Sequence, residues 1–339
     1  MATTTEAMGT IGATGGREGV LTTDWRAPDW RAPDRRRMLQ LVLATIWLLD
    51  AVLQMQPYMF TNAFGTRMIE GMSVGNPAGL AHQITSAGRV IGHHAMVSNA
   101  VFVLVQMLIA LGIAWRPTVK IALAGSVAWA LFVWWIGEGL GGVLTGTESP
   151  ITGAPGAVIV YALLAVLLWP TDRGAATAPF VAARSLGAGA ARTLWLVLWG
   201  SESYYALQAV NRSPQGLHDV LRAMAAGQPH WLSSLDDTVA RLVAHRGLGV
   251  SIVLAAVCAV IAVGAFLPAA AGRATIVMAA ALATVIWVVG EGFGNVFSGS
   301  GTDPNTGPLL ILMAAAFWPR RVETPVPETT PSFVLSGTS

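Results

Sequence analysis

Charge is scarce in this sequence. Only 11% of its 339 residues are Asp, Glu, Lys or Arg, against roughly 25% in a soluble domain of average composition. By contrast, 54% of the residues are hydrophobic. This composition excludes an ordinary cytosolic enzyme, a disordered chain and a nucleic-acid-binding protein, and it indicates a protein whose main partner is the lipid bilayer.

Cysteine and lysine are almost absent. The single cysteine, Cys258, excludes an intrachain disulfide, and its apolar surroundings predict a packing role. Lys120 is the one lysine beside nineteen arginines, and the formal net charge of +2 gives no sign of a polyanionic partner. The first 37 residues lack the apolar core of a cleaved secretory signal, so we expect the first apolar run to be retained.

Apolar runs of membrane-spanning character recur along the chain. They predict an all-α integral membrane protein with eight transmembrane helices. Two longer and less apolar connections carry apolar residues at helical spacing, which predicts amphipathic helices on the outer face. The predicted spans lie near 38–56, 95–115, 121–140, 154–169, 193–210, 248–267, 274–290 and 307–318, and the two connections are 57–94 and 211–247.

Arginine placement predicts the orientation of these spans. If the N-terminus is cytoplasmic, fourteen basic residues fall on the cytoplasmic side and six on the outer side. Basic residues favour the cytoplasmic side of a membrane. We therefore expect a multi-pass protein of the cytoplasmic (inner) membrane with both termini inside.

The chain repeats itself. Trp47 matches Trp199 at an offset of 152 residues, and Trp134-Trp-Ile-Gly-Glu138-Gly matches Trp287-Val-Val-Gly-Glu291-Gly at an offset of 153. Pro155 is then assigned to Pro308. Each half contains four predicted spans, an even number, so the halves are expected to be two parallel four-helix repeats. The predicted organisation is a cytoplasmic N-terminus (1–37), repeat 1 (38–170), a cytoplasmic linker (171–192), repeat 2 (193–319) and a disordered tail (320–339).

A few ionisable residues recur at matched positions near the outer ends of the spans. An ionisable group within a membrane span is a candidate functional residue. Two carboxylates and an imidazole suit a divalent metal, although their spacing does not specify one. The acids could equally carry protons or bind a ligand, or pair with arginines and only hold helices together. The residues are Asp50, His93 and Glu138 with Arg89 in the first half, and Glu202, His245 and Glu291 with Arg241 in the second.

Glycines flank both Glu138 and Glu291. Small residues beside an acid allow another helix or a ligand to approach its backbone closely. The helix that follows, from Pro308 to Trp318, is only 11 residues long. The glycine segment is therefore either a tight outer hairpin or a re-entrant segment that dips into the membrane, and both remain open.

Four spans with an amphipathic loop between the first two resemble the DoxX/DoxD-like membrane proteins. The segment Gln106-Met-Leu-Ile-Ala-Leu-Gly112, followed by Arg116, looks like the second span of that family. This resemblance implies association with a membrane redox assembly and other membrane subunits. It transfers no catalytic residue.

The leading functional hypothesis is an accessory subunit that holds a lipid-like ligand such as quinone, or an ion, at the acid and histidine sites. Three alternatives remain: a proton-coupled transporter, a structural scaffold without a ligand, and a metal-dependent membrane enzyme.

Overall fold

The computed structural model describes residues 34–171 and 178–320, which form helices and no strand. Most of the predicted N-terminal segment 1–37 and of the predicted tail 320–339 lies outside these residues. The predicted linker 171–192 lies outside them at positions 172–177.

Within the described residues, four helices are long and apolar enough to cross a membrane. On α3, apolar side chains at the helical spacing of Val101, Leu104, Leu108 and Leu111 are about half exposed. Such a stripe is stable against lipid and would be unfavourable in water. The four helices are α3 (Ala95–Ala114), α4 (Val119–Ile136) with the preceding turn η3 (Arg116–Thr118), α11 (Gly247–Gly264), and α12 (Ala269–Val285) with its continuation η6 (Ile286–Gly290).

The other four predicted spans differ from these. Helices α1 (Arg35–Leu53) and α7 (Ala188–Ala206) have 19 residues each, but they carry charged residues within their length. Helices α5 (Ala157–Leu167) and α13 (Thr306–Ala316) have 11 residues each. At ~1.5 Å per residue a helix of that length extends about 17 Å, well short of the roughly 30 Å core of a bilayer. The described residues therefore support four spans of full length and apolar character, and not eight.

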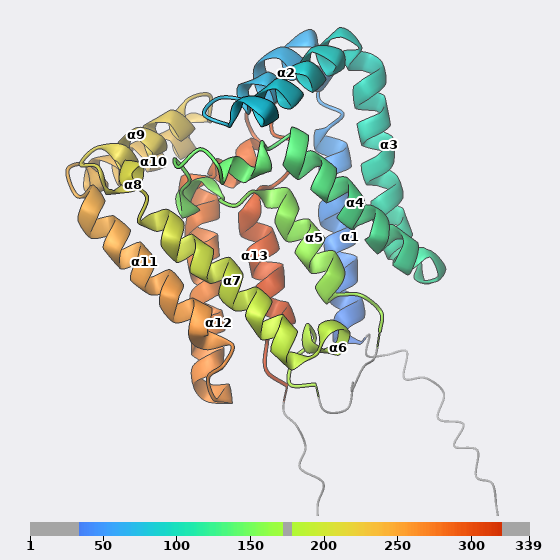
Figure 1. The fold of residues 1–339 in the computed structure, drawn as a ribbon, viewed down its shortest axis with the longest axis vertical. Coiled ribbons are helices and arrows are strands. Elements are labelled where there is room, and N and C mark those ends of the chain that lie inside the picture. The colour runs from blue at the N-terminus through green and yellow to red at the C-terminus, as the bar shows by residue number, and fades with distance from the viewer. Residues whose placement is uncertain (1–33, 172–177, 321–339) are drawn as a thin grey trace, which may run out of the picture. The chain divides into compact units, whose positions relative to one another are not determined.

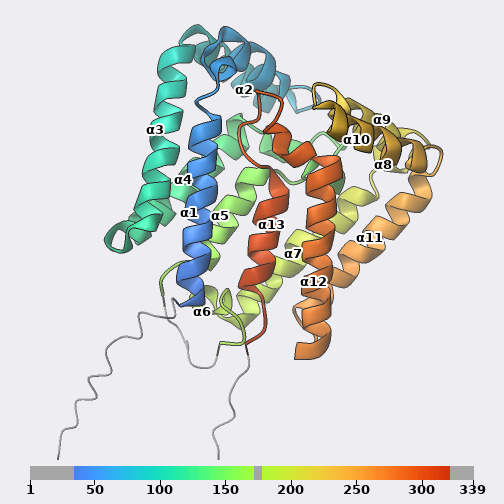
Figure 2. The ribbon, with the colours of Figure 1, turned by 180° about the vertical axis from the view of Figure 1, so that it is seen from behind.

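The short helices lie in the middle of the fold. Helix α5 contacts α13, and both views place the pair between α1, α3 and α4 on one side and α7, α11 and α12 on the other (Figures 1 and 2). Tyr161, Leu164 and Leu167 of α5 and Met313 of α13 have no exposed surface. Because neighbouring helices shield this pair, it needs neither the length nor the lipid-facing surface of a full span.

Helix α7 begins inside the predicted linker. It starts at Ala188, preceded by the short helix α6 (Ala183–Leu186), whereas the second half was predicted to start at 193. Phe180 and Ala182 are buried, and the Ala182 N–H donates to the carbonyl of Ala316 at 3.0 Å. This part of the segment belongs to the core because it closes the end of α13.

Both long connections form helices, as predicted. The first contains η1 (Pro57–Phe60), η2 (Phe64–Ile69) and α2 (Ala78–His93). The second contains α8 (Ala209–Arg212), α9 (Gly216–Ala225) and α10 (His230–Val243). We call the helices of the connection 57–94 the first lid and those of the connection 211–247 the second lid. Together they cover one end of the helix bundle, the lid end (Figure 1).

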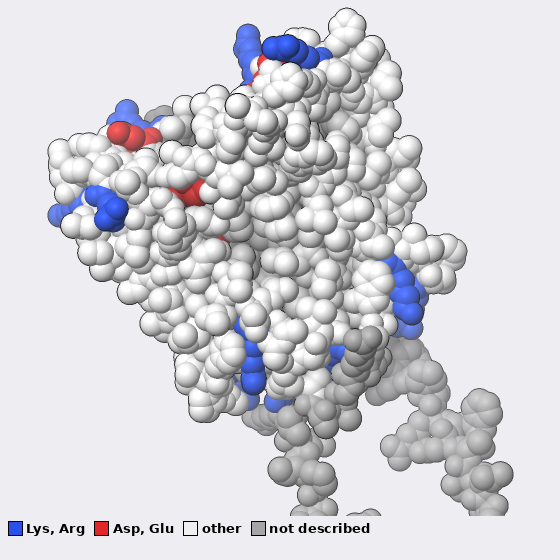
Figure 3. Space-filling view, viewed as in Figure 1, with Lys and Arg blue, Asp and Glu red and all other residues white. Residues whose placement is uncertain are grey.

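On the face shown in Figure 3, the acidic residues are confined to one end, whereas the basic residues are not. Lys and Arg appear at both ends, whereas Asp and Glu appear at the lid end. At the opposite end, Arg37 donates to the carbonyls of Ile113 and Ala114, and Gln40 donates to that of Leu168. These contacts satisfy the free carbonyls at the C-termini of α3 and α5, where a positive charge is also favoured.

Candidate functional site

Asp50 is held by a residue that the sequence prediction overlooked. It lies on α1, is 2% exposed, and accepts a 2.5 Å hydrogen bond at Oδ2 from the hydroxyl of Tyr161 on α5. Its other oxygen, Oδ1, has no hydrogen-bond partner among the described residues. The predicted alternative of pairing with Arg89 is not observed, because Arg89 is exposed on α2.

Glu138 and Glu291 bind the N-termini of the two central helices. Glu138 Oε1 accepts from the backbone N–H of Val158 on α5 at 3.3 Å. Glu291 accepts from the N–H groups of Thr306 and Gly307 on α13 at 3.3 and 3.1 Å, and from the Thr306 hydroxyl. A carboxylate at this position satisfies free N–H groups and complements the helix dipole. The presence of a glycine-flanked glutamate in both halves thus has a structural explanation.

The same contacts correct one predicted match. The indole N–H of Trp134 donates to the carbonyl of Pro155, and that of Trp287 donates to the carbonyl of Pro304, both at 2.8 Å. Pro155 therefore corresponds to Pro304, and the assignment to Pro308 was wrong. The loop before α5 is four residues longer than the loop before α13. The offset of 153 residues that aligns the two Gly-Glu-Gly motifs therefore does not align α5 with α13.

Glycine has a direct role beside Glu138. Gly156 has a φ of +107°, and a Cβ atom there would collide with the Glu138 carboxylate. Only glycine adopts this backbone readily and leaves the space. The segment 137–156 folds back as turns at the lid end, beneath Met72, Asn76 and Ile84 of the first lid.

A cavity of about 530 Å³ lies at the lid end. Its lining comes from α1, α3, α4, the first lid, the segment before α5 and residues 294–305 of the second half. Gln56 after α1 donates to the carbonyl of Gly301 at 3.0 Å and so joins the two halves at its rim. The volume is within the range of small-ligand sites.

The described ionisable side chains that line this cavity are all acidic. Four carboxyl groups line it, whereas no Lys, Arg or His does so among the residues that the structure describes. Two of the acids were predicted, Asp50 and Glu138, and two were not, Glu148 and Asp303. Burial raises the pKa of Glu148 and that of Asp303 above their ordinary values, because water that would stabilise the charged form is excluded.

Five buried polar atoms of residues that line the cavity have no hydrogen-bond partner among the described residues. Four are oxygens: Asp50 Oδ1, Asn76 Oδ1, Gln106 Oε1 and Glu138 Oε2. The fifth is the indole nitrogen of Trp129. Buried polar atoms are normally paired, so this set is unusual, and it is dominated by hydrogen-bond acceptors.

One wall of the cavity is aromatic. Ring centroids of Phe64 and Phe102 are 6.5 Å apart, those of Phe102 and Trp129 are 5.5 Å apart, and those of Trp129 and Phe132 are 5.5 Å apart. The four rings form a continuous row from η2 across α3 to α4. We call this row the aromatic wall.

Glu202 lies apart from the cavity lining. It is 3% exposed on α7, and neither of its oxygens has a hydrogen-bond partner within the described chain. The position that corresponds to Tyr161, the donor to Asp50, holds the apolar Leu310. Glu202 therefore lacks a tyrosine donor of the kind that holds Asp50. The predicted pairing with Arg241 is not observed, because Arg241 is exposed and contacts Thr238.

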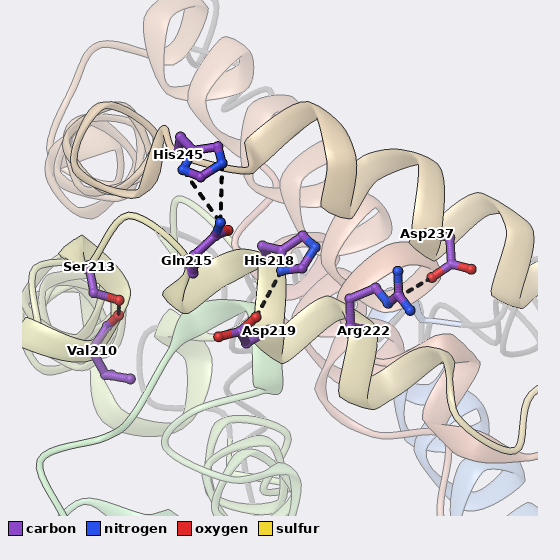
Figure 4. A network of polar contacts seen from close by, with 8 residues as sticks. All are labelled: Val210, Ser213, Gln215, His218, Asp219, Arg222, Asp237 and His245. Carbon is purple, nitrogen blue, oxygen red and sulfur yellow. Dashed lines mark hydrogen bonds and ion pairs between the residues drawn. The ribbon is translucent and has the colours of Figure 1, made fainter.

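The predicted histidines do not join the acids. His93 is exposed and packs against His94, with ring centroids 4.7 Å apart. His245 is exposed in the second lid, where it contacts Gln215 (Figure 4). Around it, His218 pairs with Asp219 and Arg222 with Asp237. No group of three or more His, Cys, Asp or Glu residues that could hold a metal ion occurs in the described ranges. The acid–imidazole–acid convergence that a metal centre required is therefore not found there.

The chain matches no known family model, no curated protein and no solved structure.

Proposed function

We propose that this protein binds a cationic solute in the lid-end cavity, on the outer side of the cytoplasmic membrane. The sign of the lining carries the proposal: four carboxyl groups and no basic side chain among the described residues. In a site shielded from water, such a lining attracts cations and repels anions far more strongly than it would in bulk solvent.

The residues that line the cavity lie toward the lid end of the bundle. Trp47 and Gln106 are among its lining residues, whereas Gln40 and Arg37 near the opposite end are not. Between them the central helix α5 is packed through Leu164 and Leu167, which have no exposed surface. This arrangement favours a binding protein over a proton-coupled transporter, which needs a path to both faces.

The finer architecture is part of the same proposal. Two parallel repeats are supported by matching contacts in the two halves. Glu138 and Glu291 each accept from N–H groups at the start of a central helix, and Trp134 and Trp287 each donate to a proline carbonyl. In these repeats α1 and α7 span the bilayer despite their charged residues, and α5 and α13 reach only part of its depth. The excess of arginine at one side supports termini inside and the lid end outside.

Quinone is a weaker candidate for this cavity. A neutral carbonyl ligand brings acceptors, and the unpartnered lining atoms are themselves mainly acceptors. Association with a redox assembly stays a prediction from the family resemblance.

Thermal unfolding of the purified full-length protein in detergent tests cation binding. The probes are sodium, potassium, magnesium, calcium, ammonium and 2-phenylethylammonium chlorides at one ionic strength. We expect at least one cation to raise the Tm of the wild type. The double variant Glu148→Gln/Asp303→Asn removes two charges from loops and is expected to lose this response.

Glu202→Gln is the matched control, because it removes an acid outside the cavity and is expected to retain the response. Absence of stabilisation by every cation, or an equal response in the double variant, would contradict the proposed function.

A further inference from the structure

The unpartnered atoms of the cavity define what a ligand must supply. Four of the five are acceptor oxygens, contributed by Asp50, Asn76, Gln106 and Glu138. A ligand that donates several hydrogen bonds would satisfy them. A bare metal ion would require a tight cluster of ligating groups, and no such cluster is present in the described part of the chain.

The aromatic wall defines the rest of the ligand. Phe102 and Trp129 present ring surface within the same cavity as the carboxyl groups of Asp50 and Glu138. Aromatic faces attract ammonium groups and also pack against apolar carbon. The cavity volume of about 530 Å³ is far larger than a hydrated-ion site needs and suits an organic molecule.

From these two observations we infer that the ligand is an organic primary ammonium ion with an apolar or aromatic body. Its ammonium group has three N–H donors, which go to acceptors among the carboxyl groups of Asp50 and Glu138 and the amide oxygens of Asn76 and Gln106. Its body packs on the aromatic wall. This inference rests on the proposed function and narrows its ligand class.

A primary ammonium is favoured over a quaternary one because of the acceptors. A trimethylated nitrogen keeps the charge but has no N–H group, so the four oxygens would stay buried without partners. Ammonium itself keeps the donors but leaves the aromatic wall uncovered. Comparing a primary ammonium ion, its trimethylated form and ammonium, which all carry one positive charge, therefore separates the contribution of the N–H donors from that of the apolar body.

Calorimetric titration of the full-length protein in detergent at pH 7.5 tests the inference. The ligands are 2-phenylethylammonium, its N,N,N-trimethyl derivative and ammonium. We expect 2-phenylethylammonium to bind at least about tenfold more tightly than either of the others, since one lost charged hydrogen bond or a lost ring contact each accounts for a factor of that order. Phe102→Leu is expected to weaken the binding of 2-phenylethylammonium more than the binding of ammonium, because only the former also loses a contact for its apolar body.

Val101→Ala is the matched control for Phe102→Leu, because Val101 lies on the exposed face of the same helix. Equal or tighter binding of the trimethyl derivative would overturn the inference. Response to inorganic cations with none to organic amines would also overturn it and leave the proposed function standing. Absence of binding to every cation would refute the proposed function as well.

Discussion

The hydroxyl of Tyr161 donates a 2.5 Å hydrogen bond to Asp50 Oδ2, and Asp50 Oδ1 has no hydrogen-bond partner among the described residues. Tyr161 thereby fixes the rotamer of the acid from α5, while the acid keeps one oxygen for a ligand. This hydrogen bond thus connects the buried helix α5 to an acid of the candidate site.

Removing the hydroxyl separates these two roles. Tyr161→Phe leaves a buried carboxylate oxygen without its donor, so we expect it to lower stability by about 1–3 kcal/mol. Cation binding is expected to persist, because the carboxyl group of Asp50 remains. Asp50→Asn is expected to weaken binding. Thermal unfolding and ligand titration on both variants measure this, and a Tyr161→Phe protein as stable as the wild type would contradict the role assigned to the hydroxyl.

Glu291 and Glu202 are both buried acids of the second half, and we expect their removal to have opposite effects. Glu291→Ala deletes the acceptor for three donors at the start of α13 and is expected to lower the Tm. Glu202→Leu replaces an acid without a partner by an apolar side chain and is expected to raise the Tm. Side-by-side melting curves in one detergent decide the matter, and a fall in Tm for Glu202→Leu would show that this acid has a stabilising partner.

Asp236 on α10 makes stability depend on pH. Burial, with a smaller contribution from Asp237, raises its pKa from 3.8 to about 6. The folded state holds this proton more tightly than the unfolded chain does, so its stabilising contribution is present below pH 3.8 and is lost as the pH rises through about 6. We expect Asp236→Asn to be about 1 kcal/mol more stable than the wild type at pH 8, after allowance for solvent screening near the surface, and equal to it at pH 3.5.

The control for Asp236 is its neighbour Asp237, which pairs with Arg222 at 3.3 Å. Asp237→Asn loses that pair and is expected to gain no stability at pH 8. A gain of the same size in both variants would indicate a general effect of negative charge on α10 rather than burial of Asp236.

Cation binding is expected to weaken as the pH falls. The midpoint of this loss should lie at a higher pH than it would for carboxyl groups with ordinary pKa values. Burial raises the pKa of Glu148 above 4.5, so this group becomes neutral earlier as the pH falls. Titrations of the cation between pH 8 and pH 4 measure the midpoint of the loss, which we expect above pH 4.5. A midpoint below that value would contradict a role for Glu148 in binding.

Hydrophobic patterning predicted the membrane class, the two lids and the order of the helices. It could not distinguish α5 and α13 from full spans, because both an enclosed half-helix and a lipid-exposed span are apolar. Their length of 11 residues was the available signal. The match of Pro155 to Pro308 failed for a similar reason, since loop lengths between repeats change without a mark in the motif itself.

The candidate site was predicted only in part. The predicted duplication pointed to Asp50, Glu138, Glu202 and Glu291, but matched positions do not reveal which acids share a cavity. Asp303 and Glu148 lie in loops without an equivalent acid at the corresponding position, so a filter based on repetition missed them. Tyr161 was the one polar residue within the apolar run 157–167, and that was the available signal for its role. The histidines were placed with the acids by depth along the predicted spans, whereas the lids carry them outward.

Equilibrium binding of ligands that share a body and differ in charge tests the central claim most directly. The probes are 2-phenylethylammonium, neutral 2-phenylethanol and anionic 3-phenylpropionate, titrated into the full-length protein at pH 7.5. We expect saturable binding of the cation alone, weakened in Glu148→Gln/Asp303→Asn and retained in Glu202→Gln. Comparable or tighter binding of the alcohol or the carboxylate would contradict a cavity selected for cations.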